Sequence, residues 1–320
     1  MTTHSTAHIP VLYEEVLTQS DVKPDDLWVD CTLGRGGHTL GLLQRGARVI
    51  GLDRDRQAIS ESSHTLQSYL KDDRLSIIHT NFSDITQTLK ARGIDRVDGI
   101  LADLGVSSPQ LDEAERGFSF MKSGPLDMRM DRSHGLSAAE WVQEHSTKEL
   151  AHIFRLYGEE PRSLHLAKVI KAWSDQGGGD TLGLSRLVET STPMKVRRKL
   201  KKHPATRVFQ ALRIAVNDEL GALESLLELA PSLLTLHGKM LLISFHSLED
   251  RLIKKRFRAL SEPPPSPRRG LPPPPHEPPA FTALPRKGLI AEEGERLGNP
   301  RSRSARLRIL TRIRNPHEKV

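Results

Sequence analysis

The chain is poor in cysteine and has no long apolar run. Its 320 residues include one cysteine, Cys31, which excludes an intrachain disulfide framework and a cysteine-based zinc cluster. No apolar segment approaches the roughly 20 residues that cross a bilayer. Residues 1–10 lack the basic start and apolar core of a secretory signal. These absences favour a soluble, cytoplasmic protein without membrane association.

The charge is basic and unevenly distributed. The chain has 47 Lys and Arg against 40 Asp and Glu, a net charge of +7, in a composition that is ordinary for a globular protein. Cations concentrate in residues 195–202, 254–258 and 286–320. Any one run can be a solvated helix face. Three runs favour a phosphate-rich partner, because each cation that displaces a counterion adds affinity.

The first 110 residues alternate between short apolar runs and segments with helical periodicity. This order is typical of a parallel sheet built through right-handed crossovers. The predicted strands are residues 27–30, 48–53, 75–79 and 97–103, and the predicted helices are residues 39–45, 57–70 and 85–91. The pattern predicts an α/β fold with a parallel-rich sheet.

The alternation stops after Ser107 and resumes after Pro204. The segment between them has helical patterns without convincing strands, and it is too long for a loop inside a compact domain. Beyond it, the pattern predicts a helix at residues 206–229, a strand at 239–245, a helix at 248–260 and a last strand at 306–313. We therefore predict a core interrupted by an inserted all-helical domain.

The predicted core comprises residues 1–109 and 206–320, and the insert comprises residues 110–205. Within the core, eleven prolines fall between Pro263 and Pro285. Such density favours extended backbone and excludes the interior of strands and helices. Residues 262–286 are therefore expected to form a mobile surface excursion.

A glycine turn follows the first predicted strand. Gly34, Gly36 and Gly37 let the backbone turn sharply and approach a ligand, with helix N–H groups behind it. Asp53 ends the second strand, where a carboxylate can accept hydrogen bonds from both hydroxyls of a ribose. A dinucleotide fingerprint would need glycine at the position of Thr39. The pattern favours a nucleoside without a pyrophosphate, such as S-adenosylmethionine, over NAD; the alternative is a turn that only packs a helix on the sheet.

Two further residues suit an adenosine site. Phe82 follows the third strand, and its ring either packs on adenine or belongs to the core. Asp103 ends the fourth strand at the carboxyl edge of the sheet, where ligands bind in open α/β folds. A buried acid at the end of an apolar strand is costly unless it has a partner, which favours a functional role for Asp103.

Eight motifs, in order along nearly the whole chain, carry a resemblance to a known family. They are His8-Ile-Pro-Val-Leu12, Thr32-Leu-Gly-Arg-Gly-Gly-His38, Asp53-Arg-Asp55, Asp103-Leu-Gly-Val-Ser-Ser-Pro-Gln110, Arg116-Gly-Phe-Ser-Phe120, Gly124-Pro-Leu-Asp-Met-Arg-Met-Asp131, His203-Pro-Ala-Thr-Arg207 and Ser244-Phe-His-Ser-Leu-Glu-Asp-Arg251. With them the chain closely resembles the bacterial 16S rRNA (cytosine-N4)-methyltransferases of the RsmH (MraW) family. Each motif alone is weak, but the set is highly specific.

The resemblance implies a Rossmann-like, S-adenosylmethionine-dependent methyltransferase core split by a helical substrate-recognition domain. It implies N4-methylation of one cytidine in the decoding region of 16S rRNA, within the small ribosomal subunit. No metal site is expected. The implied cofactor contacts are Gly36, Gly37, His38, Asp53, Phe82, Asp103 and Gln110.

The expected chemistry is direct, in-line transfer to the exocyclic amine, which needs no covalent adduct and hence no cysteine. A site accelerates this attack by accepting hydrogen bonds from the amine. The chain lacks the Asp/Asn-Pro-Pro-aromatic turn of other amino-methyltransferases, which leaves Asp103, Ser107 and Ser108 as candidate catalytic residues.

RNA contacts are expected in the insert. The target base must be unstacked, and Phe118, Phe120 and Trp141 either stack on bases or belong to the core. The predicted contacts to the RNA backbone are Lys195, Arg197, Arg198, Lys199, Lys201 and Lys202.

Three other functions remain to be tested. A DNA amino-methyltransferase is disfavoured by the missing turn, and a dehydrogenase is disfavoured by Thr39. A non-catalytic RNA-binding or ribosome-assembly factor that retains the fold is disfavoured by the intact Gly36, Gly37 and Asp53. The sequence leaves open whether the protein is a monomer or a homodimer.

Overall fold

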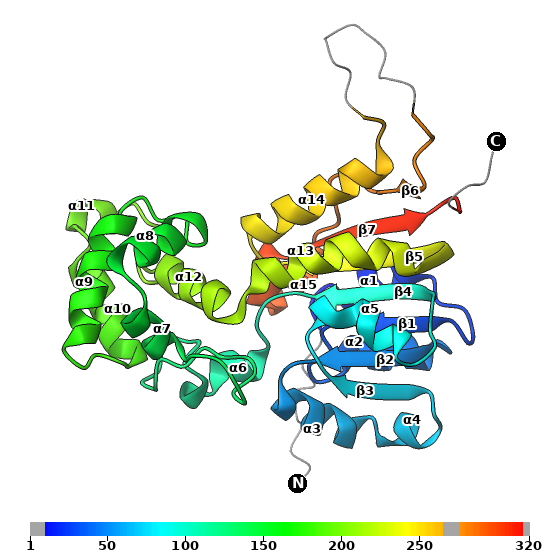
Figure 1. Ribbon diagram of the computed structural model, residues 1–320, viewed down its shortest axis with the longest axis horizontal. Helices are drawn as coiled ribbons and strands as arrows, with labels where there is room; N and C mark the ends of the chain where they lie inside the picture. Colours follow the sequence, from blue (N-terminus) through cyan, green and yellow to red (C-terminus); the bar gives the residue numbers. More distant parts are fainter. Residues whose placement is uncertain (1–9, 265–275, 316–320) are drawn as a thin grey trace, which may run out of the picture. The chain divides into compact units, whose positions relative to one another are not determined.

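The computed structural model describes residues 10–264 and 276–315 and divides the chain into two compact units (Figure 1). The first unit, the sheet unit, combines the described parts of Met1–Gly105 and Ala222–Val320. The second unit, the helical unit, is Val106–Gly221. Among the described residues, no helix combines the length and apolarity that a membrane span requires.

The sheet unit contains a seven-stranded sheet in the order β3-β2-β1-β4-β5-β7-β6. The first five strands along the chain pair in parallel, whereas β7 pairs antiparallel with β5 and with β6. The strands are β1 (Leu27–Asp30), β2 (Arg48–Asp53), β3 (Leu75–His79), β4 (Val97–Asp103), β5 (Leu234–Ser244), β6 (Phe281–Thr282) and β7 (Arg306–Arg312). The predicted parallel-rich α/β fold is confirmed. Strand order reverses between β1 and β4, which is where ligands bind in such sheets.

Helices cover both faces of this sheet because residues on its strands point alternately to the two sides. Val29 and Ile100 pack on one face with apolar residues of α5, α13 and α14. Trp28 and Leu101 pack on the other face with α1 and α2. The helices of this unit are α1 (Tyr13–Ser20), α2 (Gly37–Gln44), α3 (Arg56–Thr65), α4 (Gln67–Lys71), α5 (Ile85–Lys90), α14 (Ser247–Ser261) and α15 (Glu293–Gly298), with most of α13 (Glu219–Leu229). The result is a three-layer arrangement with two apolar layers.

The first four strands have the bounds that the sequence predicts, and the later elements differ. β5 begins at Leu234 rather than Lys239, and the register shift between Val97 and Gly99 accommodates this extension. Phe281 and Thr282 form the edge strand β6, so the prediction that residues 262–286 contain no strand is wrong there. These two residues are not prolines, and they pair with β7. Residues 265–275, the middle of the predicted excursion, lie outside the described residues.

The helical unit contains no strand over residues 106–221, all of which the structure describes. Its helices are α6 (Ser108–Asp112), α7 (Ala138–Glu144), α8 (Thr147–Leu156), α9 (Ser163–Asp175), α10 (Thr181–Thr190), α11 (Met194–Arg197) and α12 (Thr206–Asn217). They enclose their own apolar core, which includes Phe118, Phe154 and Phe209. The predicted all-helical character is confirmed.

The predicted single helices at residues 57–70 and 206–229 are each two helices. α3 and α4 meet at Leu66. α12 ends at Asn217, and Asp218, which caps it, has a left-handed φ of 45°. The Asn217 side chain accepts a hydrogen bond from Met130 N (2.8 Å) and donates one to Met128 O (2.7 Å). Apolar periodicity continues through Asp218, so the sequence pattern did not reveal this break.

Gly99 of β4 lies opposite Trp28 of β1, and the packed indole ring leaves no room for a side chain at position 99. A Cβ at Gly99 would lie 2.2 Å from Cδ2 of Trp28, a ring that is only 1% exposed. We expect Gly99→Ala to lower the free energy of unfolding by about 1–3 kcal/mol, because the packed ring must shift. Chemical denaturation measures this change. The control is Gly294→Ala, where a Cβ would meet no described atom within 4 Å and the change should stay within about 0.5 kcal/mol. Equal effects of the two substitutions would contradict the packing argument.

Candidate functional site

The turn between β1 and α2 presents backbone to the carboxyl edge of the sheet. Gly34 and Gly36 have positive φ angles of 51° and 76°, and Gly36 caps α2. A Cβ at Gly36 would lie 2.6 Å from Leu66 Cδ1, and one at Gly37 would lie 2.5 Å from Pro10 Cγ. Both predicted cofactor positions therefore require glycine, and packing alone accounts for part of that requirement.

Asp53 is fixed at the end of β2 with acceptor capacity to spare. Its Oδ2 accepts a hydrogen bond from Gly34 N (2.7 Å) and its Oδ1 accepts one from Asp55 N (2.8 Å). A carboxylate offers about four acceptor sites, so about two remain for the hydroxyls of a ribose. Burial raises the pKa of Asp53, and the two N–H groups oppose that rise.

A buried hydrogen-bond network, which the sequence pattern does not reveal, joins the ends of β1 and β4 to α2. Thr39 Oγ1 donates to Asp30 Oδ2 (2.7 Å), and Thr32 N donates to Asp30 Oδ1 (3.1 Å). Asp103 N in turn donates to Thr32 Oγ1 (2.6 Å). The one sequence feature that pointed to this network is Thr39, which stands where a dinucleotide fingerprint has glycine. Its hydroxyl bonds the buried Asp30, a contact that glycine could not make.

Asp103 and His38 face each other at the carboxyl edge. Asp103 Oδ2 lies 3.8 Å from His38 Nε2, too far for a hydrogen bond. Among the described residues, neither His38 Nε2 nor Asp103 Oδ1 has a hydrogen-bond partner. Such buried atoms are costly unless a ligand satisfies them.

Burial sets the charge state of this pair. It raises the pKa of Asp103 to about 8, with a further contribution from Asp30, and lowers the pKa of His38 to about 4. At neutral pH the imidazole is neutral and much of the Asp103 carboxyl holds its proton. A cationic ligand would favour the ionised carboxylate and release that proton.

The other predicted site residues lie in different surroundings. Phe82 is 8% exposed and packs in the apolar layer with α5, and its contact with adenine stays a prediction. Gln110 Oε1 accepts a hydrogen bond from Ser107 N (3.0 Å) in the capping box of α6. Ser107, Ser108 and Gln110 all belong to the helical unit. Their contacts with cofactor or target amine remain predictions.

The basic run of residues 195–202 lies on α11 and the turn after it. Arg197 is half-buried and pairs with Glu189 (3.0 Å). The five exposed cations of the run are Lys195, Arg198, Lys199, Lys201 and Lys202. Their exposure makes them available to an anionic partner, whereas Arg197 has a structural role as well.

A profile of the MraW methylase family matches residues 5–313 of the chain. The chain belongs to this family. Membership in a methylase family removes the dehydrogenase alternative and supports the predicted use of S-adenosylmethionine.

Named relatives cover almost the whole chain. "Ribosomal RNA small subunit methyltransferase H" of Halorhodospira halophila is 44% identical, over 97% of this chain and 95% of its own length. The proteins of the same name from Anaeromyxobacter sp. (strain Fw109-5) and Oceanobacillus iheyensis are 45% and 43% identical. The alignments cover 96% of this chain and 98% and 94% of those relatives, respectively.

The residues at the carboxyl edge fit the cofactor of such a methylase. S-adenosylmethionine has a ribose and two cationic groups, a sulfonium and an ammonium. The spare acceptor sites of Asp53 suit the ribose, and the unpartnered Oδ1 of Asp103 suits a cation.

Asp103 should make the unliganded protein less stable as the pH rises. The ordinary pKa of an aspartic acid side chain is 3.8, whereas the pKa of Asp103 in the folded protein is about 8. Between about pH 4 and pH 8 the folded state therefore binds more protons than the unfolded state. Stability then falls with rising pH across this window. Asp103→Asn has no such proton to lose. We expect it to melt above wild type at pH 8, with the difference shrinking toward pH 5. Calorimetry at both pH values measures this; identical melting temperatures at pH 8 would show that the carboxyl ionises without cost.

Proposed function

We propose that this protein transfers a methyl group from S-adenosylmethionine to N4 of one cytidine in the decoding region of 16S rRNA, within the small ribosomal subunit. The observation that carries the proposal is the 43–45% identity, over nearly full length, to proteins named small-subunit rRNA methyltransferases. The polar atoms at the carboxyl edge of β1, β2 and β4 supply a site that suits the donor.

Each proposed cofactor residue contacts a different part of S-adenosylmethionine. The backbone at Gly36 and Gly37 approaches it closely, the Asp53 carboxylate accepts from the ribose, and Phe82 contacts the adenine. The cationic end lies toward His38 and Asp103. Gln110, which belongs to the helical unit, is the remaining proposed cofactor residue. When bound, S-adenosylmethionine supplies an electrophilic methyl group.

Asp103 is the proposed group for handling the target amine or for orienting the cofactor. The N4 lone pair of cytosine is delocalised into the ring, so an acceptor that takes a hydrogen bond from the amine makes it a better nucleophile. Once the cationic cofactor has displaced its proton, the Asp103 carboxylate can also receive the proton that the amine must lose. Ser107 and Ser108 are the other candidate acceptors.

The reaction is tested on small subunits from a strain that lacks the gene. Purified protein and S-adenosylmethionine with a labelled methyl group should place one label per 16S rRNA, recovered by mass spectrometry as N4-methylcytidine. Asp103→Asn should lower the transfer rate at least tenfold. If cofactor affinity falls equally, Asp103 holds the cofactor; if only the rate falls, it acts on the amine.

Two outcomes of that experiment contradict the proposal. A label on a ring carbon or on another nucleotide would show a different acceptor. RNA binding without any labelled RNA, in protein that binds the cofactor, would favour the assembly-factor alternative.

Neutralising the basic run should weaken RNA binding and its dependence on salt. In Arg198→Gln/Lys199→Gln/Lys201→Gln, the loss of three phosphate contacts should reduce the slope of log affinity against log salt by about 2. Filter binding of 16S rRNA fragments at several salt concentrations measures the slope. The control is Lys71→Gln/Lys90→Gln/Arg92→Gln, three exposed cations of the sheet unit. The same slope in both triple variants would reject the assignment.

A further inference from the structure

The segment before β7, residues 299–304, lies at the carboxyl edge of the sheet. β7 pairs antiparallel with β5, and Arg306 at its start lies opposite Ser244 at the end of β5. β5 pairs in parallel with β4, and Ile243 lies opposite Asp103. The segment that leads into β7 is therefore brought to the edge where β4 and β5 end, although it is distant from Asp103 in the sequence.

Hydrogen bonds and buried small residues fix the backbone of this segment. It forms the short 3-10 helix η4 (Pro300–Ser304), in which Arg301 N donates to Oδ1 of Asn299 (3.1 Å). Ser302 is 1% exposed, and its hydroxyl donates to Asn299 O (2.9 Å). The buried Ala305 packs in the same apolar layer as α1 and α2. Arg301 is half-buried, and its side chain therefore extends from a backbone that is held in place.

The Arg301 guanidinium acts on the Asp103 carboxyl. Burial and the charge of Asp30 raise the pKa of Asp103 to about 8, and the positive charge of Arg301 opposes that rise. Charges that are far apart are screened by water and salt, so an effect of this kind requires the two groups to be close. The strand pairing and the charge effect agree in placing a guanidinium near the carboxyl group that ends β4.

A neighbouring carboxylate and guanidinium are complementary to the amino-acid end of S-adenosylmethionine. That end carries an ammonium and a carboxylate on one carbon atom, so the partners of these two groups must lie close together. Asp103 Oδ1, which has no hydrogen-bond partner among the described residues, suits the ammonium. An arginine suits the carboxylate, because its planar fork of N–H donors can bind both oxygens at once.

The cofactor residues that the sequence predicts leave the carboxylate without a cationic partner. Six of the seven are glycine, phenylalanine, glutamine or aspartic acid. The seventh, His38, is neutral at neutral pH because burial lowers its pKa to about 4. Backbone N–H groups at the start of α2 are alternative donors to the carboxylate. Arg301 differs from them in carrying a full positive charge.

We infer that Arg301 binds the carboxylate of S-adenosylmethionine beside the Asp103 that receives its cationic end, so that the two side chains together recognise the zwitterion. The inference rests on the proposed assignment of Asp103 to the cofactor. It adds a cofactor contact from the C-terminal part of the chain, and it makes the site selective for nucleosides that retain the whole amino acid.

The test compares S-adenosylmethionine with decarboxylated S-adenosylmethionine, which keeps the nucleoside, the sulfonium and the amine and lacks the carboxylate. Calorimetric titration of the full chain measures both affinities in the absence of RNA. Wild type should bind the intact cofactor about tenfold to a hundredfold more tightly, as expected for a charge-assisted pair of hydrogen bonds. Arg301→Gln should lose this preference, because its affinity for the intact cofactor falls while its affinity for the decarboxylated ligand stays at the wild-type value.

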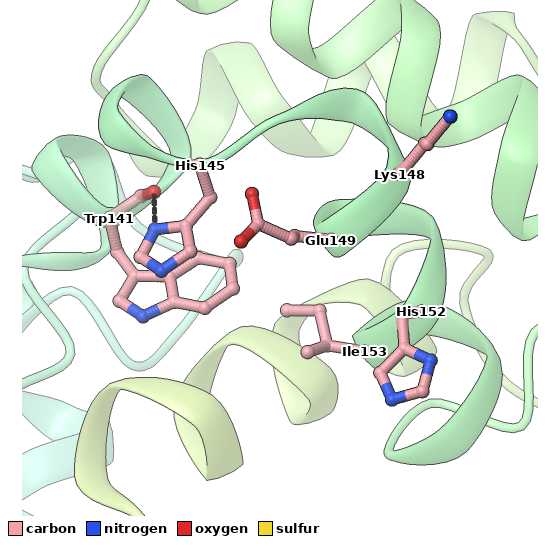
Figure 2. Close-up of a pocket in the computed structure, with 6 residues that line it drawn as sticks. All are labelled: Trp141, His145, Lys148, Glu149, His152 and Ile153. Carbon is pink, nitrogen blue, oxygen red and sulfur yellow. Dashed lines mark hydrogen bonds between the residues drawn. The ribbon is translucent and has the colours of Figure 1, made fainter.

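Three further variants separate this contact from a general effect of charge. Arg303→Gln removes an exposed cation of the same 3-10 helix, whose Nε donates to Arg296 O (3.1 Å). Lys148→Gln removes an exposed cation that lines a pocket of the helical unit (Figure 2). Both variants should keep the wild-type preference for the intact cofactor. Arg301→Lys retains the charge but not the planar fork, and it should keep part of the preference.

Three results would overturn the inference. Wild type could bind the two ligands equally, which requires no variant to show. Arg301→Gln could bind the intact cofactor as tightly as wild type, which would favour the backbone donors of α2. Arg301→Gln could also lose affinity equally for both ligands, which would mean that Arg301 acts through Asp103 or through the fold.

These outcomes are independent of the acceptor base, because the titrations contain no RNA. A protein that shows the expected preference in wild type and its loss in Arg301→Gln, but labels no cytidine N4, would support the carboxylate contact and reject the proposed function. Normal N4 labelling with equal binding of the two ligands would do the reverse.

Discussion

The buried carboxylate of Asp30 is the interaction on which the geometry of the site depends. It is 1% exposed, and its two oxygens accept from Thr39 and Thr32, which belong to α2 and to the turn after β1. Thr32 then accepts from the backbone of Asp103. One acid therefore fixes the start of α2 against the ends of two neighbouring strands, at the point where strand order reverses. An unpaired carboxylate in this position would be strongly destabilising.

The same arrangement places three acids at the carboxyl ends of neighbouring strands: the buried Asp30 and the half-buried Asp53 and Asp103. Burial raises the pKa of each, and Asp30 adds to the rise at Asp103. At neutral pH the unliganded protein therefore holds a proton on Asp103, and among the described residues Asp103 Oδ1 and His38 Nε2 have no hydrogen-bond partner. A cationic nucleoside would release that proton and supply interactions to these atoms. Part of the binding energy comes from relieving this unfavourable state. The same residues therefore lower the stability of the unliganded protein and favour binding of the ligand.

The helical unit has its own apolar core, and capping residues stabilise the starts of several of its helices. Its helices begin at capping residues such as Ser137, Ser146 and Asp180, which satisfy the first N–H groups locally. This leaves exposed positions of α8 and α11, such as Lys148 and Lys195, to carry cations. The exceptions are informative: Arg197 pairs with Glu189, and Phe118 is buried, so not every candidate for RNA contact is available.

The sequence alone determined the first four strands, β1 to β4, because each is an apolar run of strand length with clear bounds. It also indicated the family through motifs along the chain. Tertiary structure decided what periodicity does not encode. The helix break at Asp218 follows from the Asn217 side chain bonding a loop far away in sequence. The role of Thr39 follows from a partner nine residues earlier that only the fold brings near, and the stacking of Trp141 on His145 follows from where α7 ends. Local patterns report which side chains must be buried; the partners of buried and stacked polar groups depend on contacts made only when the chain has folded.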